Sequence, residues 1–480
     1  MTEPADLSAV EARRLIGRKA LSPVELLESC LSRIEASNGA LNAMVTFDAD
    51  GARAMARAQE ADVMAGEALG PLHGLPVAVK DLTATAGMRT TQGSLIYKDD
   101  VPKADDPMVA NVRAAGGNIV GKTNTPEFGA GANTTNRVFG PTGNPFDPSK
   151  TCGGSSGGAA VALATGQVPL ATGSDYGGSL RTPAGFCGVA GFRSSPGLVP
   201  GSGRPVALAP FSVTGPMGRS IADAHLLLRA QIAIDKRDPY SSCDAELIPE
   251  LLGAIDLGTV TAAFSADLGC APVAKAIRRT FESRTKAFRH LFAEASDETP
   301  DFADVHEVFE TLRGLYFVAA HRERLEKHRD LLDRNVIDNT ERGLALSLAD
   351  VARANVAQTR LYRRFLAFFD EVDVLIAPAA SVSPFPHSEL FVASIDGEAM
   401  PTYMRWLAIT YAPTMALATA AVIPCGLDEA GLPFGIQVIG PNGADALVLE
   451  VAHALEEALA AIPETRRPVP DLAALAKATS

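Results

Sequence analysis

Short apolar runs, separated by residues rich in glycine, serine, threonine and proline, dominate the sequence from Gly70 to about residue 218. Three of these runs, 77–79, 118–120 and 168–171, have the length and composition of buried strands. Residues 107–115 have a helical pattern and lie between two of them. Strands that alternate with helices predict an α/β fold built on a sheet.

Helical patterns flank this region on both sides. Residues 5–70 are helical in pattern, and Ser22-Pro23-Val24-Glu25 is typical of a helix start, with a serine cap and a proline at the first helical position. Further helices are expected over these ranges: 220–231, roughly 270–370, and 443–461.

Three late runs also have the pattern of buried strands, at 372–378, 421–424 and 434–439. We expect them to complete the same sheet, which predicts one large domain over residues 1–480 with a helical excursion. Its expected parts are N-terminal helices (1–70), a glycine-rich core (71–230), a variable helical region (about 231–370), and C-terminal strands with a helix (371–480).

Composition argues against several classes of function. The formal net charge is −13 and the pI about 5.2, which disfavours binding to nucleic acid or anionic membranes. No apolar run is long enough to span a membrane, and the first residues lack the pattern of a secretory signal. We therefore expect a cytoplasmic protein.

The cysteines support neither a zinc site nor a redox motif, because no Cys-x-x-Cys pair occurs. Their sparseness suits a reducing compartment. The six lie scattered at these positions: Cys30, Cys152, Cys187, Cys243, Cys270 and Cys425.

Two familiar motifs occur in an unsuitable context. Gly116–Thr123 satisfies the P-loop expression, but the expected strand 118–120 lies inside the motif and a helix precedes it, so nucleotide binding is not expected. Gly153–Gly157 contains Gly-x-Ser-x-Gly, yet a loop rather than a strand precedes it. An α/β-hydrolase with Ser155 as nucleophile, and His387 as the best available base, is therefore disfavoured.

The stretch from Gly153 to Pro183 carries the strongest chemical signal. Residues 157–165 can form a tightly packed helix of small residues, with Ser155 at the end where backbone N–H groups point outward. After a strand, Tyr176-Gly177-Gly178-Ser179 can form a turn that aims successive N–H groups at one point beside a serine hydroxyl. A glycine-rich structural loop is the alternative interpretation.

This stretch resembles the amidase signature family. The family pattern Gly-Gly-Ser-Ser-Gly-Gly, followed by Asp-x-Gly-Gly-Ser-x-Arg-x-Pro, is met at every fixed position. The family's lysine motif is matched by Gly-Leu-Pro-Val-Ala-Val-Lys-Asp, in which the lysine is Lys80. Lys80 precedes Ser155 by 75 residues, and Ser155 precedes Ser179 by 24. The resemblance spans nearly the whole chain and is weakest over about 235–370.

The resemblance implies an α/β/α domain with a mixed, twisted central sheet covered by helices. It implies that Ser179 is the nucleophile that becomes acylated, and that Ser155, in a cis peptide, bridges Ser179 to Lys80. Backbone N–H groups from Tyr176 through Gly177 and Gly178 to Ser179 would hold the oxyanion. No metal or cofactor is implied.

Such chemistry requires a base, since a serine hydroxyl is a weak nucleophile. No histidine lies in the matched stretch, and a free lysine has a pKa of about 10.4. Lys80 must therefore be held largely neutral by burial and neighbouring donors. Asp81 would oppose this, but adjacent strand residues point to opposite faces, so its carboxylate is expected to point away.

Other residues receive structural interpretations. Asp175 and Arg181 are predicted to pair with each other rather than bind substrate, and Cys187 to be a small buried thiol. His321 and His328 are predicted to lie on a solvated helix face rather than to bind a metal. Three aromatic residues are compatible with an acyl pocket or with core packing: Tyr403, Trp406 and Tyr411.

The expected function is hydrolysis of a small-molecule carboxamide to a carboxylate and ammonia or an amine, through an acyl-Ser179 intermediate. The glutaminase subunit of a tRNA-dependent amidotransferase is the alternative, because it resembles the same stretch. A non-catalytic binding protein is disfavoured, since Lys80, Ser155 and Ser179 are all present. A homodimer is left open. The family builds its acyl pocket largely from the variable region, here about 235–415, so the substrate is not implied. Tyr176, at a position that is often small in the family, would narrow that pocket or stack on an aromatic substrate.

Overall fold

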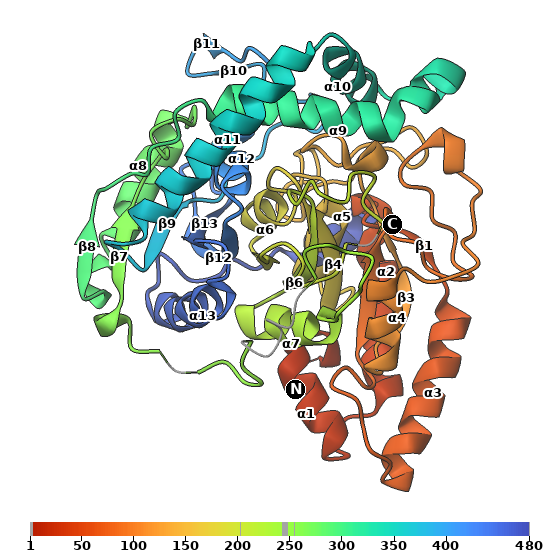
Figure 1. The fold of residues 1–480 in the computed structure, drawn as a ribbon. Helices are drawn as coiled ribbons and strands as arrows, with labels where there is room; N and C mark the ends of the chain where they lie inside the picture. The colour runs from red at the N-terminus through yellow and green to blue at the C-terminus, as the bar shows by residue number, and fades with distance from the viewer. Residues whose placement is uncertain (1–2, 202, 242–247, 254, 480) are drawn as a thin grey trace.

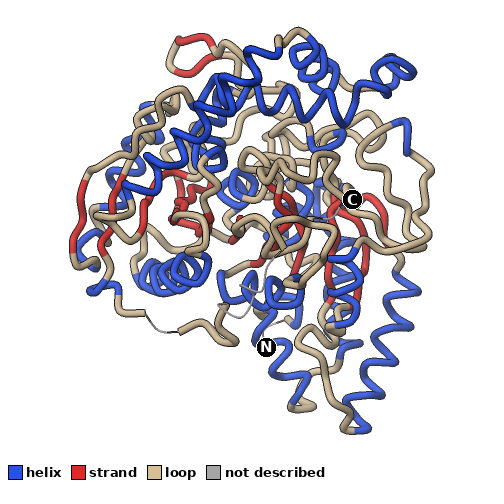
Figure 2. The backbone as a smooth tube through the Cα atoms, in the orientation of Figure 1, coloured by secondary structure: helices blue, strands red, loops and turns tan. Residues whose placement is uncertain are grey.

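The computed structural model describes residues 3–201, 203–241, 248–253 and 255–479. Within these residues, eleven strands form one mixed sheet that runs through the molecule, surrounded by helices (Figure 1). A hairpin of β10 (Ser394–Ile395) and β11 (Glu398–Ala399) lies apart from this sheet (Figure 2). The α/β fold class predicted from the sequence is confirmed.

The strands of the sheet come from the whole length of the chain. In sheet order they are β1 (Met44–Phe47), β3 (Asn118–Thr123), β2 (Pro76–Lys80), β4 (Leu170–Asp175), β6 (Val213–Gly218), β5 (Ala190–Arg193), β12 (Thr419–Leu427), β13 (Pro433–Gly440), β9 (Val374–Pro378), β7 (Thr261–Phe264) and β8 (Glu294–Ser296).

Strand directions divide the sheet into three parts. β3, β2 and β4 are mutually parallel, as are β9, β7 and β8, whereas every other adjacent pair is antiparallel. The pairing of β5 with β12, which sets Gly191 opposite Val422, joins the early strands to the late ones. The prediction that the late strands complete the same sheet is therefore confirmed.

Helices surround the sheet, and α9, α10 and α11 lie together at the top of Figure 1. Within the described residues, no helix is long and apolar enough to cross a membrane. The α-helices are α1 (Ala9–Gly17), α2 (Pro23–Leu41), α3 (Ala49–Ala65), α4 (Pro107–Ala114), α5 (Gly157–Ala164), α6 (Arg181–Cys187), α7 (Ile221–Gln231), α8 (Lys275–Thr285), α9 (Val305–His328), α10 (Arg334–Leu344), α11 (Leu348–Phe368), α12 (Ala408–Met415), α13 (Asp445–Ala461) and α14 (Leu472–Thr479).

Glycines of β13 show how closely the helices approach the sheet. A Cβ on Gly435 would lie 2.8 Å from Gly185 of α6, and a Cβ on Gly440 would lie 2.6 Å from Val448 of α13. Residues five positions apart in a strand point to opposite faces. The two helices therefore cover opposite faces of the sheet, as the resemblance implied.

Helix α5 is buried along its whole length. A Cβ on Gly158 would lie 2.4 Å from the backbone nitrogen of Asn124 and 2.7 Å from the carbonyl oxygen of Ala43. The helix fits against the neighbouring chain only because its residues are small. This confirms the tightly packed helix predicted over 157–165 and fixes the loop that precedes it.

Five of the eleven strands in the large sheet, and both strands of the β10–β11 hairpin, were not predicted from the sequence. Some lack a plain apolar run, because β5 contains Arg193 and β6 contains Gly215 and Pro216. β8 is largely exposed and lies inside the range predicted to be helical, so that prediction was wrong at 294–296. The remaining two are β7 and β1, and β1 lies inside the range 5–70 that was predicted to be helical, so that prediction was wrong at 44–47.

Candidate active site

Lys80 is the last residue of β2, which pairs in parallel with β4. Because parallel strands end at the same edge of a sheet, Lys80 lies beside the end of β4. Its Nζ lies 2.8 Å from Oγ of Ser155, 2.8 Å from Oγ of Ser156 and 3.0 Å from Oγ of Ser174. Three hydroxyl groups therefore contact one buried amine.

Burial controls the protonation of Lys80. Loss of solvent lowers the pKa of Lys80 to about 7, against a smaller opposing effect of the Asp175 carboxylate. Asp81 does not contact the amine, because its carboxylate accepts hydrogen bonds from the N–H (3.1 Å) and the hydroxyl of Thr91. The predicted orientation of Asp81 is confirmed, and a substantial fraction of Lys80 is neutral near pH 7.

Ser155 and Ser156 lie in the loop that precedes α5, and both side chains are buried. The peptide bond between Gly154 and Ser155 is cis, as the resemblance implies. Residues 152–156, all of them described, belong to no strand. Ser155 therefore does not occupy a nucleophile elbow, which a strand would enter directly.

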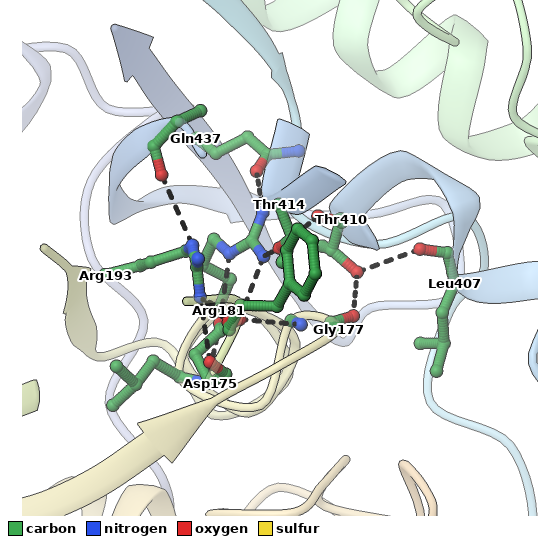
Figure 3. A network of polar contacts seen from close by, with 12 residues as sticks. Asp175, Gly177, Arg181, Arg193, Leu407, Thr410, Thr414 and Gln437 are labelled. Carbon is green, nitrogen blue, oxygen red and sulfur yellow. Dashed lines mark hydrogen bonds and ion pairs between the residues drawn. The ribbon is translucent and has the colours of Figure 1, made fainter. Parts of the chain in front are cut away.

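Asp175, the last residue of β4, organises the turn that follows it (Figure 3). Its carboxylate accepts hydrogen bonds from the N–H groups of Gly178 (3.0 Å) and Leu180 (3.1 Å). It also forms ion pairs with Arg181 (3.0 Å) and Arg193 (3.3 Å), and all three side chains are fully buried. The predicted pairing with Arg181 is confirmed, and Arg193 is a second partner.

Opposing effects set the charge of Asp175. Burial raises its pKa, but the attraction of Arg181 and Arg193 outweighs burial and holds the pKa well below its usual range. Arg181 is fixed further by hydrogen bonds to Gln437 (3.2 Å) and Thr414 (2.8 Å) (Figure 3). Asp175 therefore stays ionised near neutral pH and acts as a structural anchor of the turn.

Thr410, from the variable region, also holds the turn. Its hydroxyl donates to the carbonyl oxygen of Gly177 at 2.7 Å (Figure 3). A Cβ on Gly178 would lie 2.2 Å from the Thr410 hydroxyl oxygen, and Gly178 has a φ of +115°. Both the space and the left-handed backbone therefore require glycine at this position.

Ser179 ends the turn and is half-buried. Its carbonyl oxygen accepts a hydrogen bond from the N–H of Ser156 (3.3 Å), which holds the turn against the loop that carries Ser155. Within the described part of the chain, no protein acceptor contacts the N–H groups of Gly177 and Ser179, whereas that of Gly178 is used by Asp175. The N–H groups of Gly177 and Ser179 are free to bind a ligand.

Most of the P-loop match, Asn118–Thr123, forms strand β3. Lys122 is a buried residue of β3, and its amine donates to the Thr85 hydroxyl (2.8 Å) and to the carbonyl oxygen of Thr83. The expectation that this motif does not bind a nucleotide is therefore supported. Among the described residues, no group of three or more His, Cys, Asp or Glu side chains could hold a metal ion.

The sequence left Tyr403, Trp406 and Tyr411 open between an acyl pocket and core packing, and all three are buried. Trp406 and Tyr411 are buried in the core, where Tyr411 stacks on Phe309 at 3.9 Å between ring centroids. Cys187 is buried as predicted. The prediction of a solvated face for His321 was wrong, because its ring is only 5% exposed.

The surroundings of His321 explain that error. Its ring lies 4.7 Å from the ring of Phe128 and 5.1 Å from that of Phe317. Burial also lowers its pKa to about 3. Helical spacing could not show that the distant segment carrying Phe128 covers this face of α9, whereas His328, at the end of α9, is exposed as predicted.

Sequence reasoning gave no role to several residues that shape the site. Ser156 is a fixed position of the family pattern, so it could have been found. Ser174 stands next to Asp175 but matches no motif. Arg193 and Thr410 had no local signal, because each reaches the turn from a distant segment.

Comparisons with known proteins agree with this architecture. The family model described as Amidase matches residues 25–449. An acylamidase from Rhodococcus erythropolis is 33% identical over 457 residues, which cover 94% of this chain and 95% of that protein. One subunit of the glutamyl-tRNA(Gln) amidotransferase from Anaeromyxobacter sp. (strain K) is 34% identical over 495 residues, covering 95% and 97%.

Solved structures give the same result. The crystal structure of a bacterial aryl acylamidase of the amidase signature enzymes has a TM-score of 0.85 and 28% identity, and the match covers 98% of each chain. The matches define the class of protein, a hydrolase that acts on amide bonds. The chain belongs to the amidase family, as its motifs indicated.

Proposed function

We propose that this enzyme hydrolyses a small-molecule carboxamide through an acyl-Ser179 intermediate and releases a carboxylate together with ammonia or an amine. The contact of 2.8 Å between Lys80 Nζ and Ser155 Oγ carries the proposal. Burial lowers the pKa of Lys80 to about 7, so the amine can act as a base near neutral pH.

A protonated Lys80 can donate to all three hydroxyls, whereas the neutral amine has two hydrogens and one lone pair. Donation to Ser156 and Ser174 leaves the lone pair to accept the O–H of Ser155. Ser155 can then receive a proton from Ser179 while it passes its own to Lys80. A histidine is not needed for this relay.

In the proposed cycle, Oγ of Ser179 bonds to the amide carbon while its proton moves through Ser155 to Lys80. The N–H groups of Gly177 and Ser179 stabilise the oxyanion, and Tyr176 and Gly178 shape the turn that presents them. The relay then returns the proton to the amide nitrogen, so that the C–N bond breaks and a neutral amine leaves. Water attacks the acyl-enzyme through the same relay and releases the acid.

The nucleophile can be tested directly with an anilide substrate and with phenylmethanesulfonyl fluoride. We expect Ser179→Ala to lower kcat by about 10³-fold or more, and to lose the sulfonyl adduct that mass spectrometry detects on the wild-type enzyme. Ser32→Ala, at an exposed position of α2, serves as the control and keeps both properties. Full turnover by the Ser179 variant would overturn the assignment.

The relay base can be tested with Lys80→Ala, which should lose nearly all amidase activity. Some esterase activity should survive, because an alkoxide leaves more readily than an amide nitrogen. Matched anilide and phenyl ester substrates measure this difference. Unchanged anilide turnover in Lys80→Ala would exclude Lys80 as the base.

The glutaminase subunit of a tRNA-dependent amidotransferase is the second candidate. A relative of this kind is 34% identical over nearly the full chain. Turnover of a simple anilide by the purified chain, without a partner or ATP, favours the free hydrolase. Hydrolysis of glutamine alone, and only in the presence of a partner protein, would favour the amidotransferase role.

We also propose that residues 1–480 form a single domain that functions in the cytoplasm. The five cysteines that the structure describes are unpaired, which supports a reducing compartment, while Cys243 lies outside the described residues. We expect no nucleic-acid or membrane partner and no cofactor. A homodimer is proposed for the assembly, and light scattering of the purified protein tests it.

A further inference from the structure

Arg313, in the middle of α9, is a buried arginine whose hydrogen-bond partners are neutral. Its side chain is buried, with 5% of the residue exposed. Nε donates to the side-chain oxygen of Asn339 at 3.0 Å, and Nη2 donates to the hydroxyl of Tyr403 at 3.2 Å. Across the residues that the structure describes, no carboxylate forms an ion pair with Arg313.

Arg181 and Arg193, which are also buried, have a counter-charge, because both pair with Asp175. Burying an unpaired charge is costly, and interaction with aromatic faces offsets only part of that cost. Arg313 lies over three aromatic rings, the nearest being that of Phe317 at 4.6 Å, and is therefore a buried cation with no counter-anion among the described residues.

Arg313 lies next to the turn that carries the proposed nucleophile. Its guanidinium carbon is 5.5 Å from the ring centroid of Tyr176 and 5.9 Å from that of Phe309. Tyr176 is the first residue of the turn, and a Cβ on Gly177 would lie 3.6 Å from Phe309. The positive charge of Arg313 therefore lies beside the turn whose N–H groups are proposed to bind the substrate carbonyl.

Tyr176 is also unsatisfied. Its hydroxyl oxygen is buried and has no hydrogen-bond partner among the described residues. This unpartnered hydroxyl belongs to the ring whose centroid lies 5.5 Å from the guanidinium carbon of Arg313. A carboxylate can satisfy both, since it accepts several hydrogen bonds and matches the planar fork of arginine.

We propose that Arg313 is a specificity-determining residue that binds a carboxylate on the acyl part of the substrate. The preferred substrates are then monoamides of short dicarboxylic acids. Their free carboxylate pairs with Arg313 and accepts a hydrogen bond from the hydroxyl of Tyr176. The acyl side is assigned because Tyr176 and Gly177, which lie next to Arg313 and Phe309, belong to the turn proposed to bind the carbonyl. This inference rests on the proposed acyl-Ser179 mechanism.

Three anilides of similar size test the proposal with the purified full-length enzyme. Butyranilide is neutral, succinanilic acid carries a carboxylate on the acyl chain, and 4-butyramidobenzoic acid carries one on the leaving amine. We expect kcat/KM for succinanilic acid to exceed that for butyranilide at least tenfold. Equal or lower values for succinanilic acid, or a preference for the carboxylate on the amine, would overturn the proposal.

Two variants connect the preference to Arg313. Arg313→Met should reduce the ratio of kcat/KM values for the two acyl substrates to about one, mainly through a higher KM for succinanilic acid. Asn339→Asp turns the side-chain oxygen that accepts from Nε of Arg313 into part of a carboxylate, so Arg313 gains a counter-charge and the ratio should fall as well. The second variant keeps the test decisive where Arg313→Met does not fold.

Arg322→Met is the matched control, because Arg322 is an exposed arginine nine positions further along α9. It should leave the ratio unchanged. A ratio that persists in both Arg313→Met and Asn339→Asp contradicts the role of Arg313. Failure of the acyl-enzyme mechanism would be seen separately, because Ser179→Ala would then still hydrolyse butyranilide.

Discussion

At the scale of single residues, the basicity of Lys80 depends on the absence of a charged group among its close contacts. A charged partner would keep the amine protonated, but its three close contacts are neutral hydroxyls. The negative charge of Asp175, one strand away, is instead held by Arg181 and Arg193. The pKa of Lys80 therefore lies near 7, whereas the neighbouring carboxylate of Asp175 stays ionised throughout that pH range.

Activity should therefore follow the deprotonation of Lys80. Burial lowers the pKa of Lys80 to about 7, and only the neutral amine can accept the proton from Ser155. We expect kcat/KM for a neutral anilide to rise with pH through about 7 and to level off above it. Initial rates from pH 5.5 to 9 measure this profile.

Glu127 provides the control for this profile, because burial raises the pKa of Glu127 to about 7 as well. Its carboxylate accepts hydrogen bonds from the hydroxyl of Ser94 (2.6 Å) and the N–H of Asp333 (2.6 Å), and neither of these groups contacts the Lys80 amine. In Glu127→Gln, kcat/KM should still rise with pH through about 7. Loss of this rise in that variant would assign the titration to Glu127 instead.

At the scale of elements, the sequence was sufficient to predict an element where the interacting residues are close together in the chain. Helix α2 starts at Pro23 with the predicted capping box, in which Ser22 and Glu25 satisfy each other's backbone donors. Strand β5 had no such signal, since its place depends on pairing with β6, the next strand, and with β12, which comes from a distant segment. Ser155 and Ser179 were predicted as site residues because family motifs mark them, whereas Thr410 belongs to a segment without a motif.

The close packing of α5 leads to a stability prediction. A valine at Gly158 would place a Cβ against backbone atoms of Asn124 and Ala43, which cannot move as a flexible side chain can. We expect Gly158→Val to lower the free energy of unfolding by about 3 kcal/mol or more. Gly203→Ala is the comparison, since a Cβ there meets nothing within 4 Å. Equal urea midpoints for both variants would contradict this packing argument.

At the scale of the whole molecule, one sheet joins strands from the whole length of the chain. β5 and β12 pair near its middle, so neither the early nor the late strands have a complete sheet without the other. The sequence predicted this shared sheet from its apolar runs. It could not predict the strand order, because order depends on pairings between distant segments.

A shared sheet predicts cooperative unfolding. Trp406 is the single tryptophan and is buried, so its fluorescence reports on the region close to Thr410. Circular dichroism reports on all the helices together. We expect the two signals to change at the same urea concentration. Loss of tryptophan burial before loss of helix would instead show that the C-terminal part unfolds independently.

The hydrogen bond from Thr410 to Gly177 has a consequence for exchanging substrate preference between relatives. The variable region is the segment one would exchange to change specificity, and the turn that carries the proposed nucleophile would ordinarily be ignored in that design. Here the donor segment would also supply the threonine that fits against Gly178. A chimaera should therefore place its junction before Ala408 and keep the recipient's own α12, so that a new pocket meets an undisturbed turn.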